Sequence, residues 1–232
     1  MTSPVASDLA VDRELASISE SFRFLVDVTP INAEEAQVRF LASPDADPEF
    51  QYRPVEDLPD VIGARLAAVD IKSVVDPTLA SIFAAKRREI ALQLDMLSAR
   101  GTTRFMDLSL ELYGPVNESL RRQADEILNN VPEARRLRGR CLDASAIART
   151  AAEEIEQYRV YYPGLAVPIE IRDDTSGVMV ANGALLIAST ACVRTSRLAG
   201  LLAHEVGTHI LTYVNGSLQP LKLLGSGLAG YE

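Results

Sequence analysis

The chain has 232 residues, enough for one large or two small domains with a sizeable hydrophobic core. Hydrophobic residues make up 47% and charged residues 24%, which is typical of a folded globular protein and argues against extended disorder. The 23 Lys and Arg residues against 32 Asp and Glu residues give a net charge of −9, and such a surface repels nucleic-acid phosphates and anionic lipids. We therefore expect no nucleic-acid partner.

The sequence also lacks membrane and secretion signals. It has no apolar run near the roughly 20 residues that span a bilayer, and its start does not follow the pattern of a secretory signal. We expect no membrane partner and a cytoplasmic location, and the oligomeric state is left open. Two cysteines, Cys141 and Cys192, are too few for a disulfide framework and lack metal-ligand spacing, so we predict buried free thiols.

Helical patterns dominate the first 160 residues. After a Ser7-Asp8 cap, residues 7–29 carry apolar side chains at helical spacing, and Pro30 would end this helix. The most basic segments, 85–90 and 133–140, are interpreted as solvated helix faces. Further helices are expected at 32–42, 59–70, 76–99, 102–113, 116–130 and, from an Asp143 cap, 143–162.

Strand patterns begin after Pro163. Residues 166–172 and 177–181 read as short strands, and Asn182-Gly183 between two apolar runs is a strong hairpin signal. A helix follows, starting near Thr195. The sequence thus predicts a single α+β domain over 1–232, with a helical portion (1–160) and a portion of strands, hairpin and motif-bearing helix (164–232), in the order of zincin peptidases.

The segment "LLAHEVGTHIL" places Glu205 directly after His204, and His209 five positions after His204. The best-known zinc-peptidase motif spaces its histidines four residues apart on a helix, so that both reach one ion. On a regular α-helix, a spacing of five would point the two imidazoles ~140° apart. A one-residue π-bulge would absorb the extra residue, and Gly207 lies where such a distortion is easiest. The spacing is therefore compatible with a metal site if the helix widens between Glu205 and His209.

Two interpretations of these histidines stay open at this point. Histidines on an apolar helix are usually core or boundary residues whose ring nitrogens find protein partners. This chain, however, has only two histidines, and both lie in one hexapeptide with a carboxylate beside the first. A metal ion with bound water would satisfy all three polar side chains together. We favour a metal site over a purely structural role.

Residues 194–232 resemble a bacterial family named after a Gln-Glu-Gly-Leu-Ala motif and described as flavohemoglobin expression-modulating proteins. That family is similar to the microtubule-associated tyrosine carboxypeptidases, which share the HExxxH pattern present here as HEVGTH. Residues 18–40 and 83–115 and the Asn-Gly hairpin also resemble it, so the likeness covers most of the chain.

The resemblance implies roles for individual residues. His204 and His209 match the two histidines that bind Zn²⁺, and Glu205 matches the general base. The family's third zinc ligand is a glutamate of the Gln-Glu-Gly-Leu-Ala segment, which we expect beyond residue 232. The sequence is therefore expected to be truncated at its C-terminal end, with weakened zinc binding and no peptidase activity in the 232-residue chain alone.

The predicted function is a zinc-dependent metallopeptidase, a carboxypeptidase that removes a C-terminal tyrosine-like residue from a peptide or protein. By residue type alone, Arg194, Arg197, Lys86 and Arg87 are candidates for binding the substrate carboxylate, although structural ion pairs explain such residues more often. Two alternatives remain. The chain could be a non-enzymatic regulatory or scaffold protein that affects expression of a partner, or another metal-dependent amide hydrolase.

Overall fold

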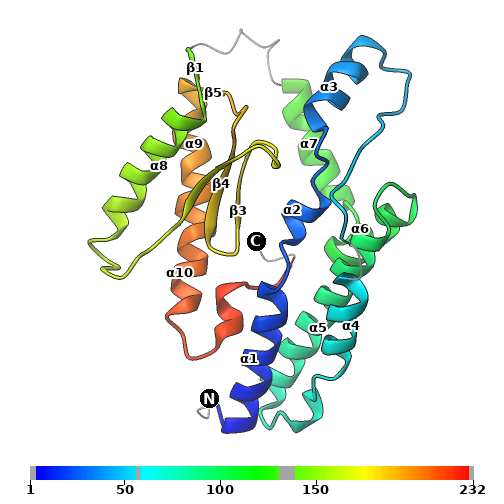
Figure 1. Cartoon of the computed structure of the whole chain (residues 1–232), viewed down its shortest axis with the longest axis vertical. Helices are drawn as coiled ribbons and strands as arrows, with labels where there is room; N and C mark the ends of the chain where they lie inside the picture. The colour runs from blue at the N-terminus through cyan, green and yellow to red at the C-terminus, as the bar shows by residue number, and fades with distance from the viewer. Residues whose placement is uncertain (1–3, 56–57, 131–138, 230–232) are drawn as a thin grey trace.

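A computed structural model describes residues 4–55, 58–130 and 139–229, and arranges them as a helical bundle beside a small sheet that carries its own helices (Figure 1). The strands are β1 (Cys141–Leu142), β2 (Ile169–Arg172), β3 (Val178–Ala181), β4 (Ala184–Ala188) and β5 (Val193–Arg194). The α-helices are α1 (Ala6–Glu20), α2 (Phe24–Val28), α3 (Ala33–Ala42), α4 (Leu58–Ala67), α5 (Pro77–Ser98), α6 (Arg104–Tyr113), α7 (Glu118–Asn130), α8 (Ala144–Tyr158), α9 (Thr195–His204) and α10 (Leu211–Ser217). Shorter helical turns are η1 (Ile71–Ser73), η2 (Glu205–Ile210) and η3 (Lys222–Gly225).

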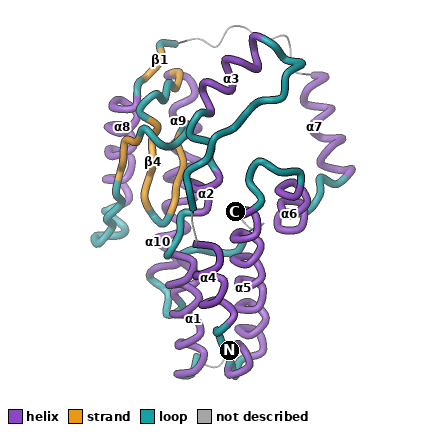
Figure 2. Tube along the Cα trace, turned by 45° about the vertical axis from the view of Figure 1, so that its right-hand side comes forward, coloured by secondary structure: helices purple, strands orange, loops and turns teal. Residues whose placement is uncertain are grey.

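The bundle is built on α1, α4 and α5, which form the lower part of the molecule in Figure 2. The long helix α5 begins where the sequence predicts, because the Asp76 side chain accepts hydrogen bonds from the Thr78 and Leu79 amides and Pro77 occupies the first turn. Residues buried between these helices include Leu15, Ile18, Phe83, Ile90 and Leu97. The turn η3 also packs here: the fully buried Asp12 carboxylate of α1 accepts hydrogen bonds from the Lys222 and Leu223 amides.

The first helix differs from its prediction. Instead of one helix over 7–29, the chain forms α1 and α2 with a break at residues 21–23. Both the amide and the hydroxyl of Ser21 donate to the Ile18 carbonyl, which ends α1. Phe22 packs into the bundle core, whereas Leu25, which continues the apolar spacing of residues 7–29, is 46% exposed. The apolar spacing continues through the break and therefore does not reveal it.

The three-stranded sheet has the order β2–β4–β3, with β4 parallel to β2 and antiparallel to β3. The central strand β4 is buried along its whole length. Because side chains alternate along a strand, Leu185 and Ile187 face a core shared with α8 and α9, while Leu186 faces Val26 of α2 on the other side. The α8 and α9 helices lie beside the sheet in Figure 1, so α8 joins this core although it precedes residue 160.

The predicted hairpin is confirmed. Asn182 and Gly183 are the two residues between β3 and β4, with φ angles of 48° and 74°. Positive φ at both positions matches the twist of a two-residue hairpin and explains the Asn-Gly pair. The observed elements give an α+β fold, as predicted. Within the described residues, none of the helices has the length and apolar character needed to cross a membrane.

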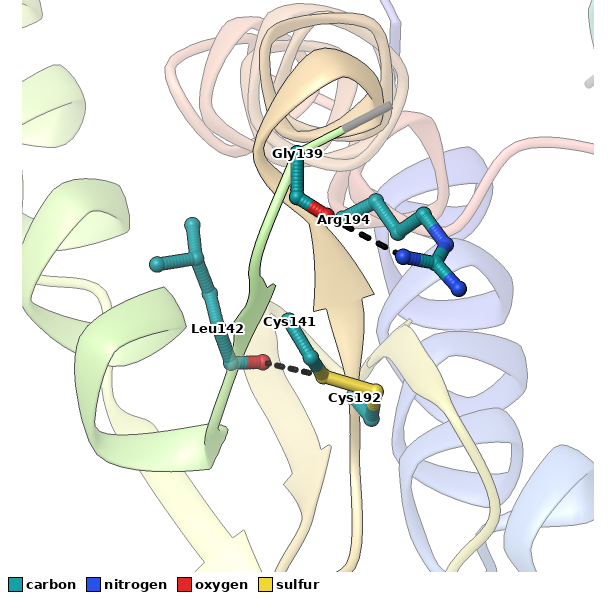
Figure 3. Close-up of a disulfide and its surroundings, with 5 residues drawn as sticks. All are labelled: Gly139, Cys141, Leu142, Cys192 and Arg194. Atoms are coloured by element: carbon teal, nitrogen blue, oxygen red, sulfur yellow. Dashed lines mark hydrogen bonds between the residues drawn. A yellow bond between two sulfur atoms is a disulfide. The ribbon is translucent and has the colours of Figure 1, made fainter. Parts of the chain in front are cut away.

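The prediction of buried free thiols is wrong. Cys141 and Cys192 form a disulfide between β1 and the residue before β5, with 5.5 Å between their Cα atoms, and both residues are exposed (Figure 3). The two short strands pair antiparallel at this point, and Arg194 donates a hydrogen bond to the Gly139 carbonyl at 3.0 Å. Sequence spacing could not indicate the bond, because the pairing of β1 with β5 brings together residues 51 positions apart.

Candidate functional site

The HEVGTH segment lies on one continuous helical stretch formed by α9, η2 and α10, called here the motif helix (residues 195–217). Residues Glu205–Ile210 form a π-helical turn inside it. This is the local widening that the five-residue spacing of the histidines requires, and it includes Gly207 as predicted. A Cβ atom at Gly207 would meet the Tyr158 hydroxyl at 3.6 Å, an ordinary contact distance, so the space at this position does not require a glycine.

The π-turn brings the two histidine side chains together. The Nε2 atoms of His204 and His209 are 3.2 Å apart, and the ring centroids are 4.7 Å apart with the planes at 85°. A regular helix would point the rings ~140° apart. The convergence of two imidazole nitrogens on one point fits a transition-metal ion, because neutral imidazole is among the ligands that zinc prefers.

Glu205 differs from the two histidines in its surroundings. It is 7% exposed, whereas His204 is exposed and His209 is half-buried. Burial raises the pKa of the Glu205 carboxyl above its ordinary value, and the charges of His209 and His204 oppose this shift. A buried carboxyl with a raised pKa beside two imidazoles is a candidate for proton transfer.

The described residues hold no third metal ligand next to this pair. Among residues 4–55, 58–130 and 139–229, no group of three or more His, Cys, Asp or Glu side chains lies in a metal-binding arrangement. In the described part of the chain, His204 and His209 are brought together without a third such side chain, and the glutamate implied by the family resemblance stays a prediction.

A cleft of about 290 Å³ opens beside His209. It lies between the motif helix, the β3–β4 hairpin, the α1–α2 break, and helices α5 and α6. Its floor and walls include Thr212 and Tyr213 of α10, together with the aromatic side chains of Phe22, Phe24 and Tyr113. Its volume is close to the lower end for pockets that hold small ligands, roughly 300 Å³.

Tyr213 joins the hairpin to the motif helix. A Cβ atom added to Gly183 would collide with the Tyr213 ring, so the ring packs directly on the glycine backbone. Two separate features therefore require glycine at position 183: its positive φ and the close approach of the Tyr213 ring. The contact fixes the position of the hairpin relative to the HEVGTH turn.

Lys86 and Glu89 form a buried ion pair in the wall of the cleft. The sequence analysis interpreted residues 85–90 as a solvated helix face and did not predict this pair. Lys86 donates to Glu89 at 2.6 Å and to the Gly227 carbonyl at 3.0 Å, and the other Glu89 oxygen accepts a bond from the Ala229 amide at 2.7 Å. The two side chains are 3% and 7% exposed. The pair ties residues 227–229 to α5 beside His209. For the second basic segment, residues 133–138 lie outside the described residues.

The other predicted cations do not face the cleft. Arg87 lies on another face of α5, where it donates to the Val69 carbonyl at 3.4 Å, and Arg194 is held next to the disulfide by Gly139. Arg197 is exposed on α9 and is not among the residues that line the cleft. One cation in the cleft wall, Arg23, was not considered from the sequence, because the predicted helix over 7–29 gave no reason to single it out.

A family model described as microtubule-associated tyrosine carboxypeptidase matches residues 38–232, which includes the sheet, the hairpin and the whole motif helix. Comparisons with curated proteins and with solved structures gave no significant match. Since the family model covers most of the sequence, the chain belongs to the microtubule-associated tyrosine carboxypeptidase family.

Proposed function

We propose that this protein is a zinc-dependent carboxypeptidase that removes a tyrosine-like residue from the C-terminus of a peptide or protein. Family membership supports the reaction class. The observation that carries the zinc dependence is the 3.2 Å separation of the His204 and His209 Nε2 atoms across a π-turn. A structural role alone would not require a widened helix that turns both rings toward one point.

His204 and His209 are the residues that would hold the ion, completed by the predicted glutamate of a Gln-Glu-Gly-Leu-Ala segment. When bound, zinc supplies Lewis-acid activation of water and of a peptide carbonyl. The two imidazoles provide neutral nitrogen donors, so a carboxylate as third ligand would offset part of the metal charge.

Glu205 is proposed as the general base. Its carboxylate would take a proton from the attacking water and return it to the nitrogen of the departing amino acid. Its burial supports this role, because a raised pKa brings the carboxyl closer to the pH at which it must both accept and donate a proton. The charges of His209 and His204 act on its carboxyl, which supports a position near the same point.

The cleft supports the proposed preference for an aromatic C-terminal residue. Phe22, Phe24 and Tyr113 line it together with Tyr213, so a substrate ring would contact aromatic side chains from several elements. Aromatic pairs add about 0.5–1.5 kcal/mol beyond the burial of their area. Such a gain would favour tyrosine over small residues at the substrate terminus.

The test uses full-length protein that includes the predicted third ligand. Calorimetric titration with zinc should give tight binding to the wild type and to Glu205→Gln, and weak binding to His204→Ala and His209→Ala. Release of tyrosine from a peptide should be lost in all three variants. If Glu205→Gln kept the wild-type rate, Glu205 would not be the base, and if both histidine variants bound zinc normally, the proposed metal site would be wrong.

A further inference from the structure

A carboxypeptidase must distinguish the chain end from an internal peptide bond, and the chemical difference is the terminal carboxylate. Recognition of that group needs a cation or several hydrogen-bond donors inside the substrate cleft. The described residues that line the cleft include two such cations, Arg23 and Lys86, and two anions, Glu20 and Glu89. The formal charge of these four groups is 2 − 2 = 0.

Lys86 is already occupied. Its ammonium group donates to Glu89 at 2.6 Å and to the Gly227 carbonyl at 3.0 Å, and the residue is 2% exposed. Binding a substrate carboxylate would require it to leave a buried carboxylate uncompensated, which is costly. Lys86 and Glu89 therefore cancel each other and hold residues 227–229 in place.

Arg23 is in a different situation. Its side chain is 41% exposed, and its guanidinium lies 3.7 Å from a Glu170 carboxylate oxygen, too far for a hydrogen bond. Glu170 in turn accepts a bond from Arg172 at 3.0 Å, so it has a closer cationic partner. The Asp27 carboxylate also lies in the field of Arg23, but Arg53 and Arg100 act on it more strongly.

The α1–α2 break explains why Arg23 is in the cleft wall. Phe22 packs in the bundle core, and the next residue, Arg23, has non-helical backbone angles (φ −111°, ψ 76°) at the start of α2. Figure 1 shows α2 between the strands and the α5–α6 helices. Arg23 and His209 thus line the same cleft from opposite ends of the sequence. The family match begins at residue 38, so it does not cover Arg23.

We infer that Arg23 binds the C-terminal carboxylate of the substrate and thereby makes the site an exopeptidase site. This inference rests on the proposed function. The guanidinium can pair with a carboxylate through two parallel hydrogen bonds, which an ammonium cannot do. With Arg23 present, the four charged side chains of the cleft wall sum to zero, and the Arg23 guanidinium is the cation left to pair with a substrate carboxylate. Without it, Glu20 leaves the wall with a net negative charge that repels a carboxylate.

The experiment compares two peptides of one sequence ending in tyrosine, one with a free terminal carboxylate and one with a terminal amide. Binding is measured by fluorescence anisotropy to zinc-loaded, full-length Glu205→Gln protein, so that no peptide is consumed. In this background, Arg23→Gln should weaken binding of the free-carboxylate peptide about tenfold to hundredfold, the usual range for a lost charge-assisted hydrogen bond. Binding of the amide peptide should stay within twofold.

Two further variants make the result specific. Arg23→Lys keeps the positive charge but loses the planar guanidinium that can donate two parallel hydrogen bonds, and it should recover part of the lost affinity. Arg39→Gln removes an exposed arginine of α3 that pairs with Glu35, away from the cleft, and should bind both peptides like the background protein. Thermal melting of each variant checks that it is folded.

Each failure has its own meaning. If the background protein prefers the free-carboxylate peptide and Arg23→Gln retains that preference, Arg23 is not the anchor although the proposed function stands. If Arg23→Gln weakened the binding of both peptides equally, the assignment would also be overturned, because the result would indicate a structural role for Arg23. If the background protein binds neither peptide, the proposed function fails and the role of Arg23 fails with it.

Discussion

Replacing Lys86 by methionine should destabilise the protein strongly. The substitution keeps an unbranched side chain of similar length but leaves the Glu89 carboxylate, 7% exposed, without its cation. Glu89 would retain only the Ala229 amide, at 2.7 Å. Breaking a buried ion pair from one side costs about 3–5 kcal/mol. Because folded domains are stable by about 5–15 kcal/mol, Lys86→Met should remove a large share of the free energy of unfolding.

A double-mutant cycle separates the pair from its neighbours. Replacing both partners, as in Lys86→Met with Glu89→Leu, removes the uncompensated charge and is often close to neutral for a buried pair. Here the double variant also loses the bonds to Gly227 and Ala229, about 1 kcal/mol each. We expect it to be more stable than Lys86→Met alone, with a coupling energy of about 2 kcal/mol or more between the two sites.

Urea unfolding measures all these free energies, and the chain offers a matched control. Arg88 neighbours this pair on α5 and contacts Glu111 at 2.8 Å, but its side chain is 67% exposed. Arg88→Met should cost less than about 1 kcal/mol. In hydrogen-exchange measurements, the Ala229 amide should exchange faster in Lys86→Met than in Arg88→Met. The reasoning is refuted if Lys86→Met is as mild as Arg88→Met, or if the effects of Lys86→Met and Glu89→Leu simply add.

Two further predictions concern the hairpin and the disulfide. Gly183→Ala should cost about 1–3 kcal/mol for positive φ and an additional amount for the collision with the Tyr213 ring. Gly177→Ala, with φ of 67° and free space around it, should cost only the backbone part, and equal losses in urea unfolding would rule out the Tyr213 contact. Replacing Cys141 and Cys192 together by serine should lower the free energy of unfolding by about 4 kcal/mol, the chain-entropy value for a loop of this length. Two free thiols detected by mass spectrometry in the native protein would contradict the disulfide.

Local signals in the sequence were sufficient for much of the fold. The start of α5 at Asp76 and of α8 at Asp143 follows from capping side chains that bond the first amides of their own helices. The Asn182-Gly183 turn follows from the positive φ that both positions adopt. The π-turn could be predicted because a five-residue spacing and convergent histidines are incompatible on a regular helix. In each case the determinant lies within a few residues.

The features that escaped prediction depend on partners distant in the sequence. Lys86 and Glu89 have the spacing of an ordinary surface pair, and only the return of residues 227–229 buries them. The break before α2 follows from Phe22 packing into a core that α4 and α5 complete. The role of Arg23 in the cleft wall depends on that break. Periodicity along one segment contains no information about such contacts, so the cleft is visible only in the assembled structure.

The central proposal is that the HEVGTH turn catalyses removal of a single C-terminal residue with the help of zinc. The most direct measurement is mass spectrometry of a peptide ending in tyrosine after incubation with full-length, zinc-loaded protein. We predict a product shorter by one tyrosine and no internal cleavage, with product formation abolished by a chelator, restored by added zinc and absent in Glu205→Gln. A peptide that stays intact, is cut internally, or is shortened equally by Glu205→Gln would contradict the proposal.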